Sequence, residues 1–134
     1  MNKWLNRLYC LEKEIKLDRR ELNRIRDRAC SGTGSYEAER VSGTNEHSKV
    51  ETYACKAADL SAKIDRSIAR SLDIKKEIYE AIMTVEDNDL RLLLKLRYLE
   101  FKKWGAIADE MNYCEYHLRH RLHKKALSRV KKPA

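Results

Sequence analysis

Three observations predict an all-α protein, in which a long antiparallel helical hairpin of the coiled-coil kind precedes a smaller helical domain. Apolar residues recur at alternating steps of three and four residues through two long segments. The 134 residues include one proline and four glycines, whereas a β protein requires many more turn-forming residues. Charged residues make up 37% of the chain while the apolar positions stay periodic, which is typical of long exposed helices with a narrow core.

The first helix is predicted to run from near the N-terminus to Ala29. Its apolar seam has one polar interruption, at Asp18, and comprises Trp4, Leu8, Leu11, Ile15, Asp18, Leu22, Ile25 and Ala29. The segment that follows contains three glycines and has no apolar period. We therefore expect a flexible loop over residues 31–45.

A second, longer seam follows the predicted loop. It comprises Val50, Tyr53, Ala57, Leu60, Ile64, Ser67, Ser71, Ile74, Ile78, Ala81 and Val85, with Ile68, Leu72 and Ile82 widening the apolar stripe. Two long helices joined by one loop most simply pair antiparallel, so residues 1–86 are predicted to form the hairpin. The seams suit either an intramolecular spacer or a coiled coil that makes a homodimer or binds another partner.

Residues 87–134 are predicted to form a separate helical domain. The acidic stretch from Glu86 to Asp89 suits an N-cap and first turn, and a strongly apolar helix follows it. A second helix carries Trp104, Ile107, Ala108 and Met111 on one face, and a three-residue break separates it from helix 115–130. The buried side of that last helix is predicted to be Leu118, Leu122, Ala126 and Val130. A small residue at Ala108 permits close helix approach, and Asn112 tolerates left-handed backbone angles, so the pattern is that of a helix-turn-helix.

The charge of the chain gathers in this predicted domain. Residues 102–134 hold nine basic and three acidic side chains, which is +6 of the formal net charge of +8. Such a segment suits a polyanion, and double-stranded DNA is the partner that a basic helix-turn-helix favours. A solvated basic face that aids solubility is the plainer alternative.

The stretch LLLKLRYLEFKKWGAIADEMNYCEYHLRHRLHKKAL resembles region four of bacterial sigma factors. The matching positions are Arg97, Tyr98, Trp104, Ile107, Ala108, Asn112, Tyr113, Leu118, Leu122, His123, Ala126 and Leu127. In its order of elements and an Arg40–Val41 pair, the whole chain is also similar to small phage regulators of the ArpU and RinA type. The resemblance implies a phage-encoded, sequence-specific transcriptional regulator that acts with the host RNA polymerase.

Two residues depart from the sigma pattern. Cys114 stands where relatives usually have a Ser or Thr cap, and Gly105 lies inside a helix, so the domain is expected to have modest stability. The chain also lacks the sigma region that melts promoters, so it is not expected to be a complete sigma factor.

The exposed side of helix 115–130 supplies the candidate binding residues. The first turns of a recognition helix reach deepest, so base edges are assigned to Glu115, Tyr116, His117, His120 and Arg121. Phosphates are assigned to Lys102, Lys103, Arg119 and Lys124. His123 is also expected on the exposed face. The plainer alternative is a basic surface that binds protein.

No metal, cofactor or catalytic role is expected. Cys114, His117, His120 and His123 are spaced by three, and each step turns about 300° around a helix, so the four side chains do not converge on one ion. No nucleophile elbow, phosphate loop or HExxH motif occurs. The scattered cysteines and the lack of a long apolar run predict a soluble cytoplasmic protein with reduced thiols and no membrane partner.

Two other functions fit the same pattern. A phage DNA-packaging adaptor, similar to a terminase small subunit, also joins a helix-turn-helix to coiled helices, although those proteins typically carry the DNA-binding domain first. Such adaptors form rings, so a measured mass of eight or more subunits would favour that function. The third possibility is a protein-only module that binds RNA polymerase.

Overall fold

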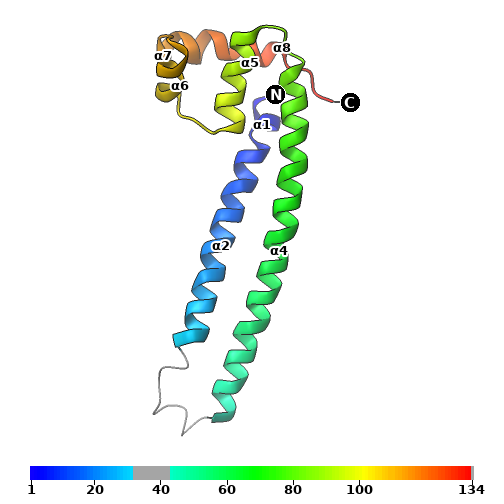
Figure 1. Ribbon diagram of the computed structural model, residues 1–134, viewed down its shortest axis with the longest axis vertical. Coiled ribbons are helices and arrows are strands. Elements are labelled where there is room, and N and C mark those ends of the chain that lie inside the picture. Colours follow the sequence, from blue (N-terminus) through cyan, green and yellow to red (C-terminus); the bar gives the residue numbers. More distant parts are fainter. Residues whose placement is uncertain (32–42, 134) are drawn as a thin grey trace. The chain divides into compact units, whose positions relative to one another are not determined.

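The computed structural model describes residues 1–31 and 43–133 of the chain, with side chains described for residues 1–29 and 49–133 (Figure 1). All regular structure in these residues is helical, and they contain no strand, which confirms the predicted all-α class. The helices are α1 (Asn2–Leu5), α2 (Arg7–Ser31), α4 (Gly43–Met83), α5 (Asn88–Leu94), η1 (Lys95–Leu99), α6 (Trp104–Met111), α7 (Glu115–His117), η2 (Leu118–Leu122) and α8 (His123–Arg129).

The predicted loop over residues 31–45 is shorter than expected at both ends. Helix α2 includes Ser31, and α4 begins at Gly43, two residues before the predicted end of the loop. Once a helix is nucleated, each added residue costs little, so a long helix readily extends past the end of its apolar seam. The middle of the predicted loop lies outside the described residues.

The contacts within the chain divide it into two compact units. The first comprises Met1–Leu11 and Arg70–Ala134, and the second comprises Glu12–Ala69. The domain boundary predicted after residue 86 therefore falls inside the first unit, because the N-terminal residues and the end of α4 contribute to the same core as the C-terminal helices.

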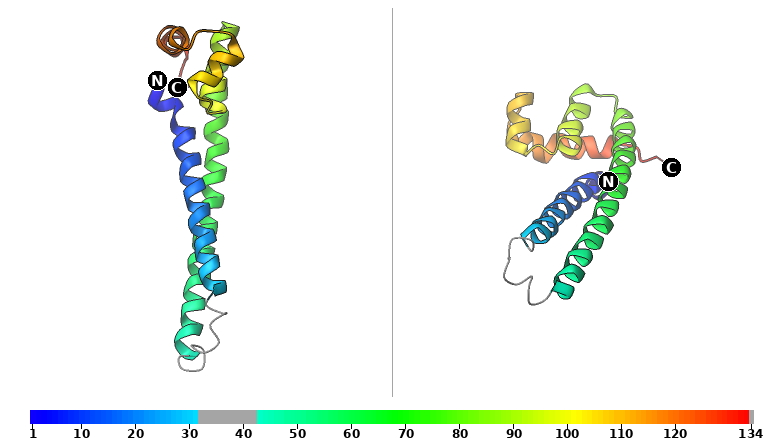
Figure 2. Two further views of the ribbon diagram at one scale, coloured as in Figure 1. Left: turned by 90° about the vertical axis from the view of Figure 1, so that its left-hand side faces the viewer. Right: turned by 60° about the horizontal axis from the view of Figure 1, so that its bottom comes forward.

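The second unit consists of parts of α2 and α4, which lie side by side in Figures 1 and 2. Predicted seam residues form its buried interior, namely Ile15, Leu22, Ile25 and Ile64. The polar seam residue Asp18 is explained by an ion pair, in which its carboxylate lies 3.3 Å from the ammonium of Lys63. Asp18 is largely shielded while Lys63 is exposed, so the pair satisfies the carboxylate but contributes at most about 1 kcal/mol.

The first unit contains the main apolar core. The core residues from α1, α2 and α4 are Leu5, Leu8, Ile74, Ile78, Ala81, Ile82 and Val85. The C-terminal helices add Leu90, Leu93, Leu94, Leu96, Tyr98, Ile107, Ala108, Leu118, Ala126 and Val130. Most of these positions belong to the apolar stripes predicted from the sequence, so one continuous core holds α5 to α8 on the end of α4.

Two residues of the predicted second stripe are exposed, namely Leu72 and Val50, whose side chain is 39% exposed. Leu72 was expected to widen the buried stripe of α4, but its side chain is 62% exposed. Its neighbour Ser71 is buried, together with Ile74 and Ile78. Successive residues of a helix point about 100° apart, so Leu72 cannot share the face that Ser71 occupies.

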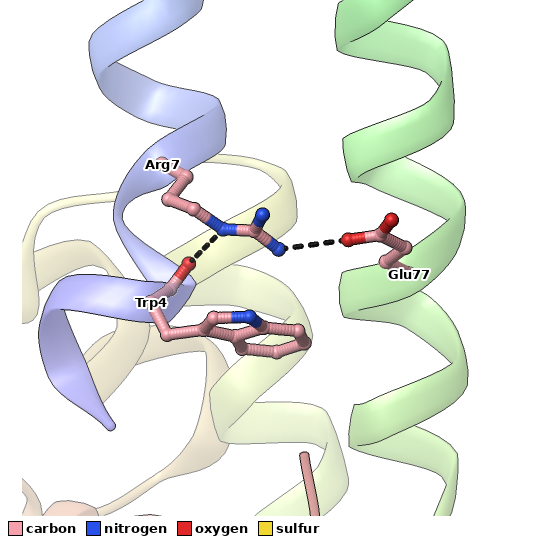
Figure 3. Close-up of polar contacts among 3 residues, drawn as sticks. All are labelled: Trp4, Arg7 and Glu77. Atoms are coloured by element: carbon pink, nitrogen blue, oxygen red, sulfur yellow. Dashed lines mark hydrogen bonds and ion pairs between the residues drawn. The ribbon is translucent and has the colours of Figure 1, made fainter. Parts of the chain in front are cut away.

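The predicted first helix is interrupted near its start. Asn6 separates α1 from α2, and Leu5 rather than Trp4 is fully buried. Figure 3 shows that Arg7 links the two sides of this break: its Nε donates to the carbonyl of Trp4 at 3.0 Å, and its Nη2 lies 2.9 Å from a carboxylate oxygen of Glu77 on α4. The guanidinium also lies 4.7 Å from the centre of the Trp4 ring, so Trp4 is covered by Arg7.

The start of α5 shows the cap that the acidic stretch predicted. Asp87 has an extended backbone, and its side chain accepts hydrogen bonds from the N–H groups of Asp89 at 2.9 Å and Leu90 at 3.3 Å. These are two of the N–H groups that a helix cannot satisfy internally.

Replacing this cap provides a test of the first unit's stability. We expect Asp87→Ala to lower the free energy of unfolding by about 1 kcal/mol, because the two N–H groups lose their acceptor. Urea unfolding followed by circular dichroism measures the change. Glu86→Ala, which removes a neighbouring exposed carboxylate, serves as the control, and equal effects of the two substitutions would contradict the capping role of Asp87.

Candidate nucleic-acid interface

The chain reverses between η1 and α6 through a tight connection. The N–H of Glu100 donates to the carbonyl of Lys95 at 3.1 Å, and Phe101 then adopts a left-handed backbone with φ of 58°. Arg97 holds this connection in two ways: its Nη1 donates to the carbonyl of Lys102 at 3.0 Å, and its guanidinium lies 4.6 Å from the centre of the Trp104 ring. The start of α6 is thereby fixed against η1.

The turn between α6 and α7 follows the sequence prediction. Asn112 adopts the left-handed conformation, with φ of 59° and ψ of 40°, which confirms the role expected for this residue. The N–H of Tyr113 donates to the carbonyl of Ala108 at 3.1 Å, and α7 begins at Glu115, so the break covers the three predicted residues. Ala108 is buried, as expected for a small residue at a close approach.

The two departures from the sigma pattern lie at the N-cap of α7 and in the first turn of α6. Cys114 is the N-cap of α7 and makes no side-chain capping bond, as expected for a poor cap. Gly105 lies in the first turn of α6, and a Cβ placed there would be 3.8 Å from an oxygen of Glu115, which is an ordinary contact. Nothing within 4 Å therefore requires glycine at position 105.

Residues 115–129 are helical without interruption, as α7, η2 and α8, and Val130 ends the helix with an extended backbone. The predicted helix 115–130 is therefore one residue too long. Leu118, Ala126 and Val130 are buried, and Leu122 packs partly buried against the core. The predicted buried row is confirmed.

The residues assigned to base edges gather on the outside of the first half of this segment. Glu115, Tyr116, His120 and Arg121 are exposed, and the side chain of Tyr116 is 69% exposed. The rings of Tyr116 and His120 lie 4.4 Å apart, so these two side chains form one aromatic surface. His117 is partly buried, with its ring 6.1 Å from that of Tyr113.

The residues assigned to phosphates differ in what they already contact. Arg119, Lys124 and Lys103 are exposed. The ammonium of Lys102 lies 2.9 Å from a carboxylate oxygen of Glu110 and 3.5 Å from one of Glu100. The hydrogen bond with Glu110 is the main cause that raises the pKa of Lys102. A phosphate at Lys102 would have to compete with two carboxylates.

His123 corrects a sequence expectation, because it faces the inside of the unit rather than solvent. Its Nε2 lies 2.5 Å from the hydroxyl oxygen of Tyr98, and its ring packs against Trp104 with a centroid distance of 4.7 Å. Burial, followed by the positive charge of Arg97, lowers the pKa of His123 to about 4. A neutral ring therefore fills this position at pH 7.

The hydroxyl of Tyr98 ties α1 into the same group of side chains. It donates to the Oδ1 of Asn2 at 2.7 Å, and because it has a single proton, the Nε2–H of His123 is the donor in the other bond. Burial raises the pKa of Tyr98 to about 12. No spacing in the sequence indicated this contact, since Asn2 and Tyr98 are 96 residues apart.

No three His, Cys, Asp or Glu side chains in the described parts of the chain are grouped so that they would hold a metal ion. No described helix combines the length and the apolar character that crossing a membrane requires.

Comparisons with protein-family models, with curated proteins and with solved structures give no match to the chain.

The buried His123 makes the stability of the first unit depend on pH. In the unfolded chain a histidine titrates near 6.5, so between pH 6.5 and about 4 the unfolded state binds a proton that the folded state does not. The free energy of unfolding is therefore expected to fall as the pH is lowered through this window, and the contribution is fully present above it.

Urea unfolding at pH 7.5 and pH 5 measures this dependence. We expect His123→Gln to reduce the loss of stability between the two pH values, whereas His120→Gln, at an exposed histidine of the same helical segment, leaves it unchanged. The burial of a neutral His123 would be contradicted if the wild type and His123→Gln lost the same stability.

Proposed function

We propose that the chain is a sequence-specific DNA-binding transcriptional regulator. In this proposal α6 and the helical segment 115–129 form a helix-turn-helix, and the segment docks into the major groove of double-stranded DNA. The phage origin and the likeness to sigma region four rest on the sequence resemblance.

The observation that carries the proposal is the outer face of residues 115–129. After Glu115 the segment contains no acidic residue, and its exposed basic side chains are Arg119, Arg121, Lys124, Lys125 and Arg129. The opposite face is buried through Leu118 and Ala126, so the orientation of the basic face is fixed by packing. A rigid helix with one buried and one cationic face is suited to the phosphate-lined groove of a duplex.

The turn between α6 and α7 supports the helix-turn-helix assignment. A left-handed residue at position 112 turns the chain between α6 and α7 within three residues, and Ala108 on α6 is a small buried residue, which permits close helix approach. In such motifs the second helix enters the groove by its N-terminal turns. Those turns carry Glu115, Tyr116, His117, His120 and Arg121, the proposed base-reading residues.

The contacts of each side chain suggest its share in binding. Arg121 is exposed and suits a bidentate contact with guanine, which contributes about 1–3 kcal/mol of discrimination. Lys103, Arg119 and Lys124 are exposed and suit phosphates, which give affinity without sequence information. Lys102 is held by Glu110 and Glu100 and is assigned a smaller contribution.

Measurements of DNA binding test this assignment. Fluorescence anisotropy with DNA flanking the gene, between 50 and 200 mM salt, is expected to show an affinity that falls steeply with salt. Arg121→Ala should relax sequence preference by about 1–3 kcal/mol at one base pair. Lys103→Ala should weaken binding to all sequences alike and more than Lys102→Ala. Binding that is absent, or unaffected by salt, would refute groove docking.

We also propose that α2 and α4 form a helical hairpin through which the protein makes a homodimer, and that the dimer acts on promoters with the host RNA polymerase. The proposal is supported in the second unit by large apolar side chains left outside the buried seam, because Leu17 is 56% exposed and Val50 is 39% exposed. A regulator that binds two half-sites requires two copies of its recognition helix.

The mass in solution checks the dimer. Light scattering coupled to gel filtration is expected to give twice the chain mass of 15.8 kDa, and replacing both Leu17 and Val50 by Glu should shift the mass to that of one chain. Circular dichroism of the variant must show unchanged helix content. A monomeric wild type would contradict the dimer, and a ring of eight or more chains would favour the DNA-packaging adaptor.

A further inference from the structure

A row of four side chains at four-residue spacing runs along the outside of the proposed recognition helix. The row comprises His117, Arg121, Lys125 and Arg129. In a regular α-helix, residues four apart drift by about 40° per step, so three steps would rotate the last residue about 120° away from the first. The four side chains can face one ligand only if the helix geometry reduces this rotation.

The buried side of the same segment shows that the rotation is reduced. Leu118, Leu122, Ala126 and Val130 have the same spacing, yet all four are buried or partly buried against one core. The middle turn, η2, is a π-helical turn, in which the N–H of His123 donates to the carbonyl of Leu118, five residues earlier. A π turn holds more residues per turn than an α turn, so it absorbs part of the drift.

The same turn keeps the outer row in line. Each member of the outer row directly precedes a member of the buried row, so a buried row that stays on one face keeps the outer row on one face too. Lys125 and Arg129 are both exposed and therefore continue the surface that begins at His117 and Arg121.

Hydrogen bonds and burial fix the C-terminal end of the helix that carries Lys125 and Arg129. Val130 is buried, and its N–H donates to the carbonyl of Ala126 at 3.2 Å. The next N–H, of Lys131, donates to the hydroxyl of Thr84 at 3.2 Å, and that hydroxyl donates to the carbonyl of Ala81 at 2.6 Å. The last turn is thus anchored on the end of α4, which holds Arg129 in a defined position.

The length of the row, compared with the width of the major groove, indicates which part of the DNA its C-terminal end would contact. Arg121 and Arg129 are eight residues apart, which is roughly 12 Å along a helix. The major groove is about 12 Å wide. A helix whose first turns reach the base edges therefore brings its last turn to the sugar–phosphate backbone that borders the groove.

We propose that Lys125 and Arg129 form a second phosphate-binding site, which grips the DNA backbone at the C-terminal end of the recognition helix. The inference rests on the proposed DNA-binding function and extends the contact surface beyond the residues that the sequence pattern assigned. Its ligand is a pair of backbone phosphates, so it contributes affinity and orientation without reading sequence.

The test is the salt dependence of DNA binding by the full chain. Each phosphate contact contributes about 0.9 to the slope of log affinity against log salt on B-DNA, so the double variant Lys125→Ala, Arg129→Ala should flatten the slope by about 1.8. Each single variant should flatten it by about half as much, and the preference among DNA sequences should stay unchanged.

A matched control removes the same charge elsewhere in the first unit. Lys75→Ala, Lys76→Ala takes two exposed lysines from α4 and should leave the slope unchanged. Circular dichroism of every variant must match the wild type, and both substituted pairs are exposed, so neither disturbs the core.

The outcomes separate this inference from the proposed function. A wild type that binds DNA with a steep salt dependence, and a double variant with the same slope, would overturn the second phosphate site and leave the proposed function standing. An equal loss in the α4 control would also overturn it, because the effect would then be one of net charge. A wild type that does not bind DNA would overturn both.

Discussion

The burial of Leu118 and Ala126 in the core of the first unit is the constraint on which the basic outer face of residues 115–129 depends. Both side chains are inaccessible to solvent and belong to the core of the first unit, and the elements that carry them contact α5 and α6. Moving either one would leave a cavity in a closely packed core. For a side chain as large as that of Leu118, such a cavity costs several kcal/mol. The outer face of residues 115–129 therefore has its orientation set from behind.

A set of polar and aromatic contacts supplements this packing. Arg97 holds the connection into α6 and lies over Trp104, and Trp104 packs against His123. The hydroxyl of Tyr98 joins His123 to α1. No described buried side-chain polar atom is left without a partner, so these contacts orient the helices without leaving a buried donor or acceptor unsatisfied. They also account in physical terms for the Arg, Tyr and Trp positions that the sequence pattern singled out.

Features that depend on neighbouring residues could be predicted from the sequence, whereas contacts between residues far apart in the chain could not. Most of the apolar seams, an N-cap within residues 86–89 and the left-handed Asn112 depend on residue type and spacing within a few positions, and these were predicted. The contact of Arg7 beside the break at Asn6 and the inward position of His123 involve partners far along the chain, namely Glu77 on α4 and Tyr98 on η1. A histidine between basic residues on a helix is normally solvated, so only the distant Tyr98 and Trp104 explain its burial.

The candidate site was predictable to a similar extent. The exposed positions of Tyr116, His120 and Arg121 follow from a helical wheel once Leu118 and Ala126 are taken as buried. The ion pair of Lys102 with Glu110 was not predictable, because Lys102 precedes α6 whereas Glu110 lies near its end, eight residues along the chain. The π turn was not predictable either, since no residue type demands it; it occurs where four apolar residues at four-residue spacing share one core.

The four-residue spacing of the outer row also places like charges next to one another. Arg121 and Lys125, and then Lys125 and Arg129, are neighbours at i,i+4 spacing, and each such pair destabilises a helix by about 0.2–0.5 kcal/mol. No acidic side chain occurs between Tyr116 and Arg129 to relieve this repulsion within the segment. The burial of the opposite side holds the charges together at that cost. A polyanion laid along the row would remove the repulsion, so the energy stored in the free helix would be recovered on binding and would add to the affinity of the proposed complex with DNA.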